Sequence, residues 1–421
     1  MTHTLTHTLL RRSLGAALLL STPILALLAG AAGFLALASV SATVPLLAAA
    51  GLAAAAGVGY LLARAAFALL GRGRFAALVF AAGSTVAVAA LAAATVLHPM
   101  PHPAPGPVPA DVRYWELPTG SRIAYVALHP AGAARPTPVI FLHGGPGTPA
   151  EGVPAGGAQL AAAGFDVYSY DQLGAGRSTR LKDVNGYTVA RDVADLDAIR
   201  RVIGAQRVIL VGESWGGSLL AQYLVAHGDH VAKAVFVSPG ALWGRQYPGT
   251  AAGDPWSRLS APEHARYQDL VDQPRLLAAA LLMDVNPNAA HALVGDDEAD
   301  HWLHELALAG KDSTTCTGAP PVPVHDNPQG FYTNQVTSRD FDRLPDPRPA
   351  LRAVRVPSLI LRGSCDFMRP QVTAEYRSTL PDSQLVLVDG AGHDIAAGQP
   401  ARYTALLTAF LLGRPLPRTA P

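Results

Sequence analysis

A long uncharged stretch near the N-terminus constrains the fold of this 421-residue chain more than any other feature. No Asp, Glu, Lys or Arg occurs from Ser13 to Ala63. A helix crosses the hydrocarbon core of a bilayer in about 20 residues, so this stretch is long enough for two crossings. It breaks at Ser39–Pro45, and another uncharged stretch covers Phe75–Leu97. Residues 1–97 are therefore predicted to form a membrane anchor whose three helices contact lipid, at about 14–38, 46–70 and 75–97.

The charges that flank these helices predict their orientation. Arg11 and Arg12 precede the first helix, and Arg72 and Arg74 lie between the second and the third. The loop between the first two helices has no Lys or Arg. Because positively charged loops stay in the cytoplasm, everything after Leu97 is expected on the extracytoplasmic side of the cell membrane. A cleaved signal peptide would explain the first helix but not the other two.

Composition narrows the classes of function. The formal net charge is +1, which gives no electrostatic basis for nucleic-acid binding. Residues 98–110 (HPMPHPAPGPVPA) are rich in proline and predict a stiff, extended linker. The chain has two cysteines, Cys316 and Cys365, which fit either free thiols or, in an exported domain, a disulfide. They lack the C-x-x-C spacing of a metal site.

After the linker, short apolar strands alternate with helical stretches. Strands are predicted at 123–127, 139–142, 167–170, 208–211, 234–237, 358–362 and 384–388. Helices are predicted near 159–163, 192–203, 218–227, 372–380 and 401–412. This alternation is typical of an α/β fold with a mostly parallel sheet covered on both faces. The alternation of strands and helices stops between 240 and 350. This predicts a helical cap, residues 240–350, inserted into a core of residues 111–239 and 351–421.

The pentapeptide Gly212-Glu213-Ser214-Trp215-Gly216 carries the first chemical signal. It fits G-x-S-x-G and lies between a β-branched apolar run and a helical stretch, the setting in which a serine hydroxyl is exposed as a nucleophile. The glycines are needed because a side chain at Gly212 or Gly216 would crowd the tight turn. Ser214 is therefore the predicted nucleophile.

A serine nucleophile needs a base and an orienting carboxylate, in the chain order Ser, acid, His. His393 follows the last predicted strand in a glycine-rich loop and is the predicted base. Asp366 follows the preceding strand and is the predicted acid. Four other carboxyl groups nearby remain rivals for that role: Glu375, Asp382, Asp389 and Asp394.

A glycine loop supplies the predicted oxyanion site. His143-Gly144-Gly145-Pro146-Gly147 follows the strand 139–142, where the N–H of Gly145 can face the developing negative oxygen. The N–H of Trp215, the residue after the nucleophile, is the second predicted donor. The imidazole of His143 is interpreted as a structural tie for this loop.

Together these motifs resemble the proline iminopeptidase group of α/β-hydrolases, serine peptidase family S33. The resemblance covers roughly Tyr114 to Leu412 and also includes two further segments: Asp171-Gln172-Leu173-Gly174-Ala175-Gly176-Arg177-Ser178 and Gly363-x-x-Asp366-x-x-x-Pro370. It implies an eight-stranded hydrolase core, a helical cap over the site and release of N-terminal residues, often proline, from peptides. It carries over Ser214, Asp366 and His393 as the triad, with Gly145 and Trp215 as oxyanion donors.

The sequence departs from that family in ways that bear on the substrate. Leu173 stands where the family usually has Arg, and Glu213 stands where a small residue is common. The family's cap supplies glutamates that bind the free amino terminus. Candidates for this role are Glu263, Asp297, Glu298 and Glu305. Asp297, Asp300, His301 and His304 would share one helix face, which fits a polar cap surface better than a metal site.

The sequence thus predicts a membrane-anchored serine hydrolase, most simply an aminopeptidase acting on short peptides through an acyl-enzyme, with no cofactor. An esterase or amidase with the same triad is the alternative from the same class. Epoxide hydrolases share the fold but need a carboxylate where this chain has Ser214. A non-catalytic, membrane-tethered binding protein is the alternative from another class, although all pieces of the site are present. The oligomeric state does not follow from the sequence.

Overall fold

The computed structural model describes residues 2–104, 106–248, 252–319, 322 and 325–418. The chain divides into two compact units. The first comprises Met1–Pro101 and Val271–Glu298, and the second comprises His102–Leu270 and Ala299–Pro421. The first unit therefore includes a segment that the sequence pattern places in the predicted cap.

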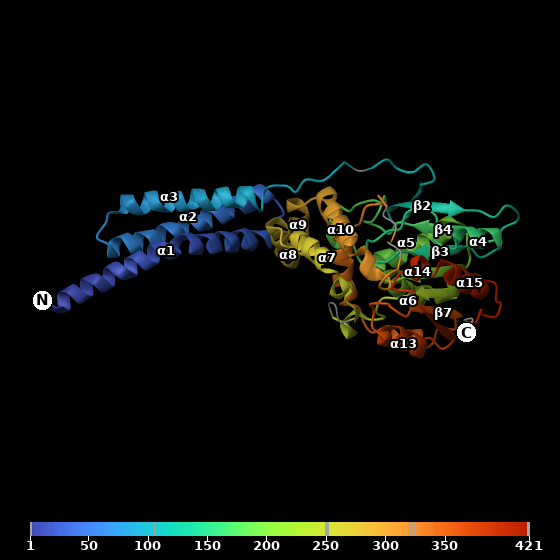
Figure 1. Ribbon diagram of the computed structural model, residues 1–421. Helices are drawn as coiled ribbons and strands as arrows, with labels where there is room; N and C mark the ends of the chain where they lie inside the picture. Colours follow the sequence, from blue (N-terminus) through green and yellow to red (C-terminus); the bar gives the residue numbers. More distant parts are fainter. Residues whose placement is uncertain (1, 105, 249–251, 320–321, 323–324, 419–421) are drawn as a thin grey trace. The chain divides into compact units, whose positions relative to one another are not determined.

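Three long helices run side by side in the first unit (Figure 1): α1 (Thr2–Ala38), α2 (Val44–Leu69) and α3 (Arg74–Ala94). Each is long and apolar enough to cross a membrane, as the uncharged stretches predict. Helix α1 begins earlier than expected, because Arg11 and Arg12 are good helix formers and do not interrupt it. The segment from the second half of the chain contributes α8 (Pro274–Val285) and α9 (Pro287–Leu293) to the same unit.

Small residues bring α1 and α2 close together. The buried face of α2 consists mainly of Gly and Ala, at Leu47, Gly51, Ala55, Gly59, Ala63 and Ala66. A Cβ added at Gly51 would lie 2.9 Å from the carbonyl oxygen of Gly30 in α1. Helices pack in membranes through such small-residue faces, because the lipid provides no hydrophobic driving force between them.

The second unit is built on one eight-stranded sheet in the order β1-β2-β4-β3-β5-β6-β7-β8. The strands are β1 (Arg113–Glu116), β2 (Arg122–Leu128), β3 (Val139–Leu142), β4 (Val167–Tyr170), β5 (Val208–Glu213), β6 (Val231–Val237), β7 (Ser358–Gly363) and β8 (Ser383–Val388). Strand β2 pairs antiparallel with both of its neighbours, β1 and β4, and the remaining pairs are parallel. Seven of these strands match the predicted ones, and β1 is an additional edge strand.

Helices cover both faces of the sheet. On one face, α4 (Gly157–Ala162), α14 (Ile395–Gly398) and α15 (Pro400–Leu411) pack against Val211, Val235, Leu361 and their neighbours. The other face is covered by α5 (Val189–Val202), α6 (Trp215–His227) and α13 (Pro370–Thr379), where the rings of Phe236 and Tyr376 lie 4.9 Å apart. Because both faces are covered, β3, β5 and β7 are buried almost throughout, which explains their continuous apolar sequence.

The insertion between β6 and β7 is mostly helical, as expected for residues 240–350. Within the second unit it contains α7 (Ala261–Val271), most of α10 (Asp296–Gly310), α11 (Phe331–Phe341) and α12 (Arg348–Leu351). Short 3₁₀ turns complete the described chain: η1 (Val184–Gly186), η2 (Gly228–His230), η3 (Gly244–Gln246), η5 (Pro255–Arg258) and η6 (Lys311–Thr314). The exact borders between anchor, linker, core and cap remain predictions.

Candidate active site

Parallel pairing aligns the carboxyl ends of the central strands at one edge of the sheet. Leu142 pairs with Gly212, Glu213 pairs with Val237, and Gly363 pairs with Val388. The loops that carry Gly145, Ser214, Asp366 and His393 all begin within a few residues of these ends. The topology therefore brings every predicted site residue to the edge where α/β sheets bind their ligands.

Ser214 lies in a sharp turn between β5 and α6. Its φ of 52° and ψ of −118° are unfavourable for a residue with a side chain. Its N–H donates to the carbonyl of Val237 at 3.0 Å, which fixes the turn to β6. A Cβ at Gly212 would collide with the carbonyl of Gly216, and one at Gly216 with the carbonyl of Leu142. These contacts confirm why the two glycines of the motif are needed.

His393 and Asp366 form a buried hydrogen-bonded pair. The distance from His393 Nδ1 to Asp366 Oδ1 is 2.8 Å, and the two residues are 8% and 6% exposed. Because a carboxylate only accepts, Nδ1 carries the proton and Nε2 is free to act as a base. Burial raises the pKa of Asp366, but the hydrogen bond and charge of His393 outweigh it and hold the pKa below its usual value.

The other candidate acids are engaged elsewhere or exposed. Glu375 forms an ion pair with Arg348 at 2.9 Å. Asp394 accepts from the N–H of Ala397 and caps α14. Asp382 and Asp389 are exposed. Among these five carboxyl groups, Asp366 is the one with a described hydrogen bond to His393. Ser214 Oγ makes no hydrogen bond within the described residues, which is common for catalytic serines without substrate.

A buried network holds the predicted oxyanion loop. The N–H of Gln172 donates to His143 Nε2 at 2.9 Å, and His143 Nδ1 lies 2.9 Å from the carbonyl of Gly144. His143 is therefore neutral and protonated on Nδ1, in agreement with burial, which lowers its pKa to about 4. The side chain of Gln172 also donates to the carbonyl of His143 and accepts from Trp215 Nε1. The imidazole thus ties the loop down, as interpreted from the sequence.

The two predicted oxyanion donors lie on either side of this network. Trp215 is the first residue of α6, so its N–H has no acceptor in a preceding helical turn. Gly145 lies in the loop between this network and the next turn, and its φ is 111°. A Cβ at the adjacent Gly144 would lie 3.1 Å from Ser214 Cβ, so the loop passes directly over Ser214. The role of both N–H groups as donors remains a prediction.

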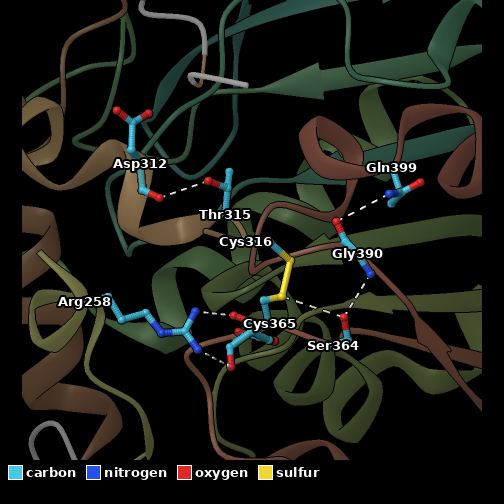
Figure 2. The surroundings of a disulfide bond; sticks show 9 residues. Arg258, Asp312, Thr315, Cys316, Ser364, Cys365, Gly390 and Gln399 are labelled. Carbon is cyan, nitrogen blue, oxygen red and sulfur yellow. Dashed lines mark hydrogen bonds between the residues drawn. A yellow bond between two sulfur atoms is a disulfide. The ribbon is translucent and has the colours of Figure 1, made fainter. Parts of the chain in front are cut away.

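A disulfide joins Cys316 to Cys365, the residue before Asp366 in the sequence (Figure 2). The N–H of Cys365 donates to the carbonyl of Ala391, and the N–H of His393 donates to the carbonyl of Thr314 at 2.6 Å. Arg258 donates to the carbonyls of Cys365 and Asp366. The acid loop, the histidine loop and the segment around Cys316 therefore form one cross-linked cluster.

The candidate carboxylates for binding a substrate amine are mostly occupied. Glu263 accepts from Ser260 at the start of α7, and Glu305 pairs with Arg266. Glu298 pairs with Arg275 at 2.6 Å with both side chains 7% exposed. Asp297 is exposed. None of these contacts leaves a buried carboxylate in the cap directed at a free amine.

One residue of the predicted polar helix face, Asp300, has protein partners. Asp300 pairs with Arg180 at 2.7 Å and accepts from the N–H of Phe331. Over the described residues, no group of three metal-binding side chains occurs. Asp300 instead fixes the insertion to the loop after β4, a role that depends on long-range contacts and leaves no local signal in the sequence.

Sequence reasoning also missed the half-buried position of Glu213 at the end of β5. Burial, followed by the negative charges of Asp394 and Asp366, raises the pKa of Glu213 to about 8. The sequence marks this residue only as an unusual neighbour of the serine. Its carboxyl group is therefore mostly neutral near neutral pH.

A mostly parallel eight-stranded sheet, with a strained serine between strand and helix and a His–Asp pair at the same edge, defines the α/β-hydrolase class. The chain belongs to the alpha/beta hydrolase fold family, which matches residues 137–397. It is 27% identical over 304 residues to "Proline iminopeptidase" of Heyndrickxia coagulans, covering 70% of this chain and 96% of that protein. The predicted resemblance to the proline iminopeptidase group is thereby confirmed.

Other relatives have different names. The chain is 29% identical over 291 residues to "Epoxide hydrolase A" of Mycobacterium tuberculosis, covering 60% of this chain and 84% of that protein. The solved structure of a proline iminopeptidase from Mycobacterium smegmatis matches with a TM-score of 0.47 and 22% identity, covering 72% and 98% of the two chains.

Proposed function

We propose that this hydrolase is a serine aminopeptidase that releases N-terminal residues from short peptides. Ser214 Oγ attacks the scissile carbonyl while His393 Nε2 takes its proton, and Asp366 stabilises the resulting imidazolium through Nδ1–H. The N–H groups of Gly145 and Trp215 stabilise the oxyanion. His393 then protonates the leaving amine, and the acyl-enzyme is hydrolysed when His393 removes a proton from water.

The observation that carries this proposal is the buried hydrogen bond between His393 and Asp366, at the sheet edge where Ser214 is held in a strained turn. The bond fixes the tautomer that leaves Nε2 basic. A protein that binds a ligand without catalysis would not need the combination of this hydrogen bond, the strained serine and the hydrogen-bonded oxyanion loop. The arrangement therefore favours an enzyme over a membrane-tethered binding protein.

We further propose that α1–α3 anchor the enzyme in the cell membrane with the hydrolase unit outside the cytoplasm. Their length and apolar composition support lipid contact through residues 14–97. The positions of Arg11, Arg12, Arg72 and Arg74 support the orientation. The disulfide between Cys316 and Cys365 agrees with it, because such bonds persist in oxidising compartments.

Esterase or amidase activity with the same residues is the second candidate. It is favoured by the ion pairs of Glu298 and Glu305, since these leave few cap carboxylates to bind a peptide amine. Epoxide hydrolysis is not favoured, despite the relative of that name. It requires a carboxylate nucleophile, and the position at the turn holds Ser214.

The test is a substrate panel with the full chain in detergent or vesicles. Proline, alanine and leucine anilides are compared with p-nitrophenyl esters of matched size. The aminopeptidase proposal predicts anilide cleavage, which stops when the substrate amine is acetylated. Ester cleavage without any anilide cleavage would reject the peptidase and support the esterase. No cleavage of either substrate type would count against both.

A further inference from the structure

Helix α8 carries apolar side chains on opposite sides, with Arg275 and Asp284 as its charged residues, although it lies at the surface of its unit. Its buried face contains Leu276, Ala279, Leu282 and Met283. Its outer face exposes Leu277, Leu281 and Val285, which are 55%, 56% and 40% exposed. These positions recur at intervals of four and therefore form one stripe. A helix with apolar side chains on opposite sides is expected inside a protein or in contact with a membrane.

Two hydrogen bonds place α8 across the end of the three-helix bundle. Near its start, Arg275 Nη1 donates to the carbonyl of Val96, just after α3 ends. Just after its end, Asn286 Nδ2 donates to the carbonyl of Ala38, the last residue of α1. The eleven residue steps from Arg275 to Asn286 correspond to about 16 Å of helix. Helix α8 therefore extends from the end of α3 to the end of α1 (Figure 1).

A buried ion pair fixes this position. Arg275 Nε lies 2.6 Å from Glu298 Oε1, and Arg275 Nη2 lies 2.9 Å from Glu298 Oε2. Glu298 also accepts from the N–H of Met100 at 2.7 Å, just beyond the bundle. The side chains of Arg275 and Glu298 are both almost fully buried, so the charge of each is balanced by the opposite charge of the other. The segment 271–298 is thus part of the anchor unit rather than a loosely attached arm.

The apolar stripe of α8 continues the apolar surface of the bundle. At the same end of the bundle, Val40, Leu46 and Leu91 are 81%, 56% and 49% exposed. Helix ends of a membrane bundle lie near the boundary between hydrocarbon and water. A helix that crosses these ends with apolar side chains outward meets the headgroup layer.

We propose that α8 is an interfacial membrane helix whose outer face, Leu277, Leu281 and Val285, inserts into the outer leaflet. The proposal rests on the proposed anchoring of α1–α3. Asp284 is exposed between Leu281 and Val285, and a carboxylate there keeps α8 at headgroup depth rather than in the hydrocarbon core. Part of the insertion of the hydrolase domain would then be held at the bilayer surface.

The test uses the full chain in phospholipid vesicles with one environment-sensitive fluorophore per variant. Both native cysteines are joined in a disulfide, so Leu277→Cys, Leu281→Cys or Val285→Cys provides a single labelling site. Val225→Cys is the matched control, because Val225 is 42% exposed on α6 of the hydrolase unit. Leu61→Cys, 67% exposed in the middle of α2, reports on the anchor itself. Lipids carry a spin-label quencher either near the headgroup or near the bilayer centre.

The proposal predicts blue-shifted emission at Leu277, Leu281 and Val285, quenched more by the shallow than by the deep spin label. Leu61 should be quenched more by the deep label, and Val225 by neither. Quenching at Leu61 without quenching on α8 would overturn the inference and leave the anchoring intact. A blue shift on α8 that no lipid quenches but chain dilution abolishes would indicate a second copy instead. Absence of quenching at Leu61 would overturn the anchoring and the inference together.

Discussion

At the scale of single residues, the hydrogen bond between His393 and Asp366 determines which imidazole nitrogen can act as a base. In Asp366→Asn, an amide can no longer serve as a purely accepting partner for Nδ1–H. We expect kcat to fall by about 10⁴-fold with little change in KM, as for other triads that lose the carboxylate. The kinetics of the preferred substrate of the panel measure this effect.

Asp394→Asn is the matched control for this prediction. Asp394 is adjacent to His393 in sequence but caps α14, and asparagine caps helices equally well. Its activity should stay near that of the parent. Equal losses in the two variants would show that Asp366 has no special role.

The pKa of Glu213 predicts how the unfolding free energy of the chain depends on pH. Its pKa is about 8 in the folded chain, against an ordinary value of 4.5. The folded state keeps the proton that the unfolded state loses, so this group lowers stability progressively between pH 4.5 and 8. The slope for one group is at most roughly 1.4 kcal/mol per pH unit. Glu213→Gln removes it, so the unfolding free energy of the variant should fall less steeply over this range.

Urea unfolding from pH 5 to pH 8, followed by the fluorescence of the hydrolase unit, measures this difference. Glu116→Gln, at an exposed position on β1, serves as the control and should retain the parent slope. Parallel curves for Glu213→Gln and the parent would contradict the neutral state of this carboxyl group.

At the scale of elements, the disulfide links the acid loop to the segment around η6, whose carbonyl at Thr314 holds His393. Cys316 and Cys365 are 49 residues apart in sequence. Closing a loop of this length contributes about 2–4 kcal/mol to stability. Cys316→Ser, or reduction of the parent, should therefore lower the unfolding free energy by this amount and reduce kcat more than it raises KM. An unchanged urea midpoint in the presence of reductant would contradict this expectation.

Much of the sheet, and the place of Ser214, Asp366 and His393 at its edge, could be predicted from sequence, because both leave local patterns. Seven strands appear as β-branched runs, and Ser214, Asp366 and His393 each follow a strand at a fixed place in the chain. Strand β1 leaves a weaker pattern, since it has four residues and alternates with exposed side chains. The hydrogen bond between Gln172 and Trp215 and the ion pair between Asp300 and Arg180 join residues that are far apart in sequence. No local sequence pattern therefore reveals these contacts.

At the scale of the whole molecule, the assignment of residues 271–298 to the unit that contains α1–α3 is the least predictable feature. It depends on the contact of Arg275 with Glu298 and with the end of α3, which the apolar sequence of α8 does not reveal. Breaking a buried ion pair by removing one partner typically costs about 3–5 kcal/mol. Glu298→Gln should therefore loosen this segment and accelerate its amide exchange in vesicles.

The matched control is Glu305→Gln, which breaks the more exposed pair with Arg266. Such surface pairs contribute up to about 1 kcal/mol, so amide exchange over 271–298 should stay close to that of the parent. Equal protection of this segment in Glu298→Gln and the parent would show that the ion pair does not hold it.

The central claim, that Ser214 is activated by His393 and Asp366, is tested most directly by covalent labelling with a fluorophosphonate. The account predicts one phosphonyl adduct on the full chain, located by peptide mass spectrometry at Ser214 and absent in Ser214→Ala. An unlabelled but folded parent chain, or an adduct that persists in Ser214→Ala, would contradict it.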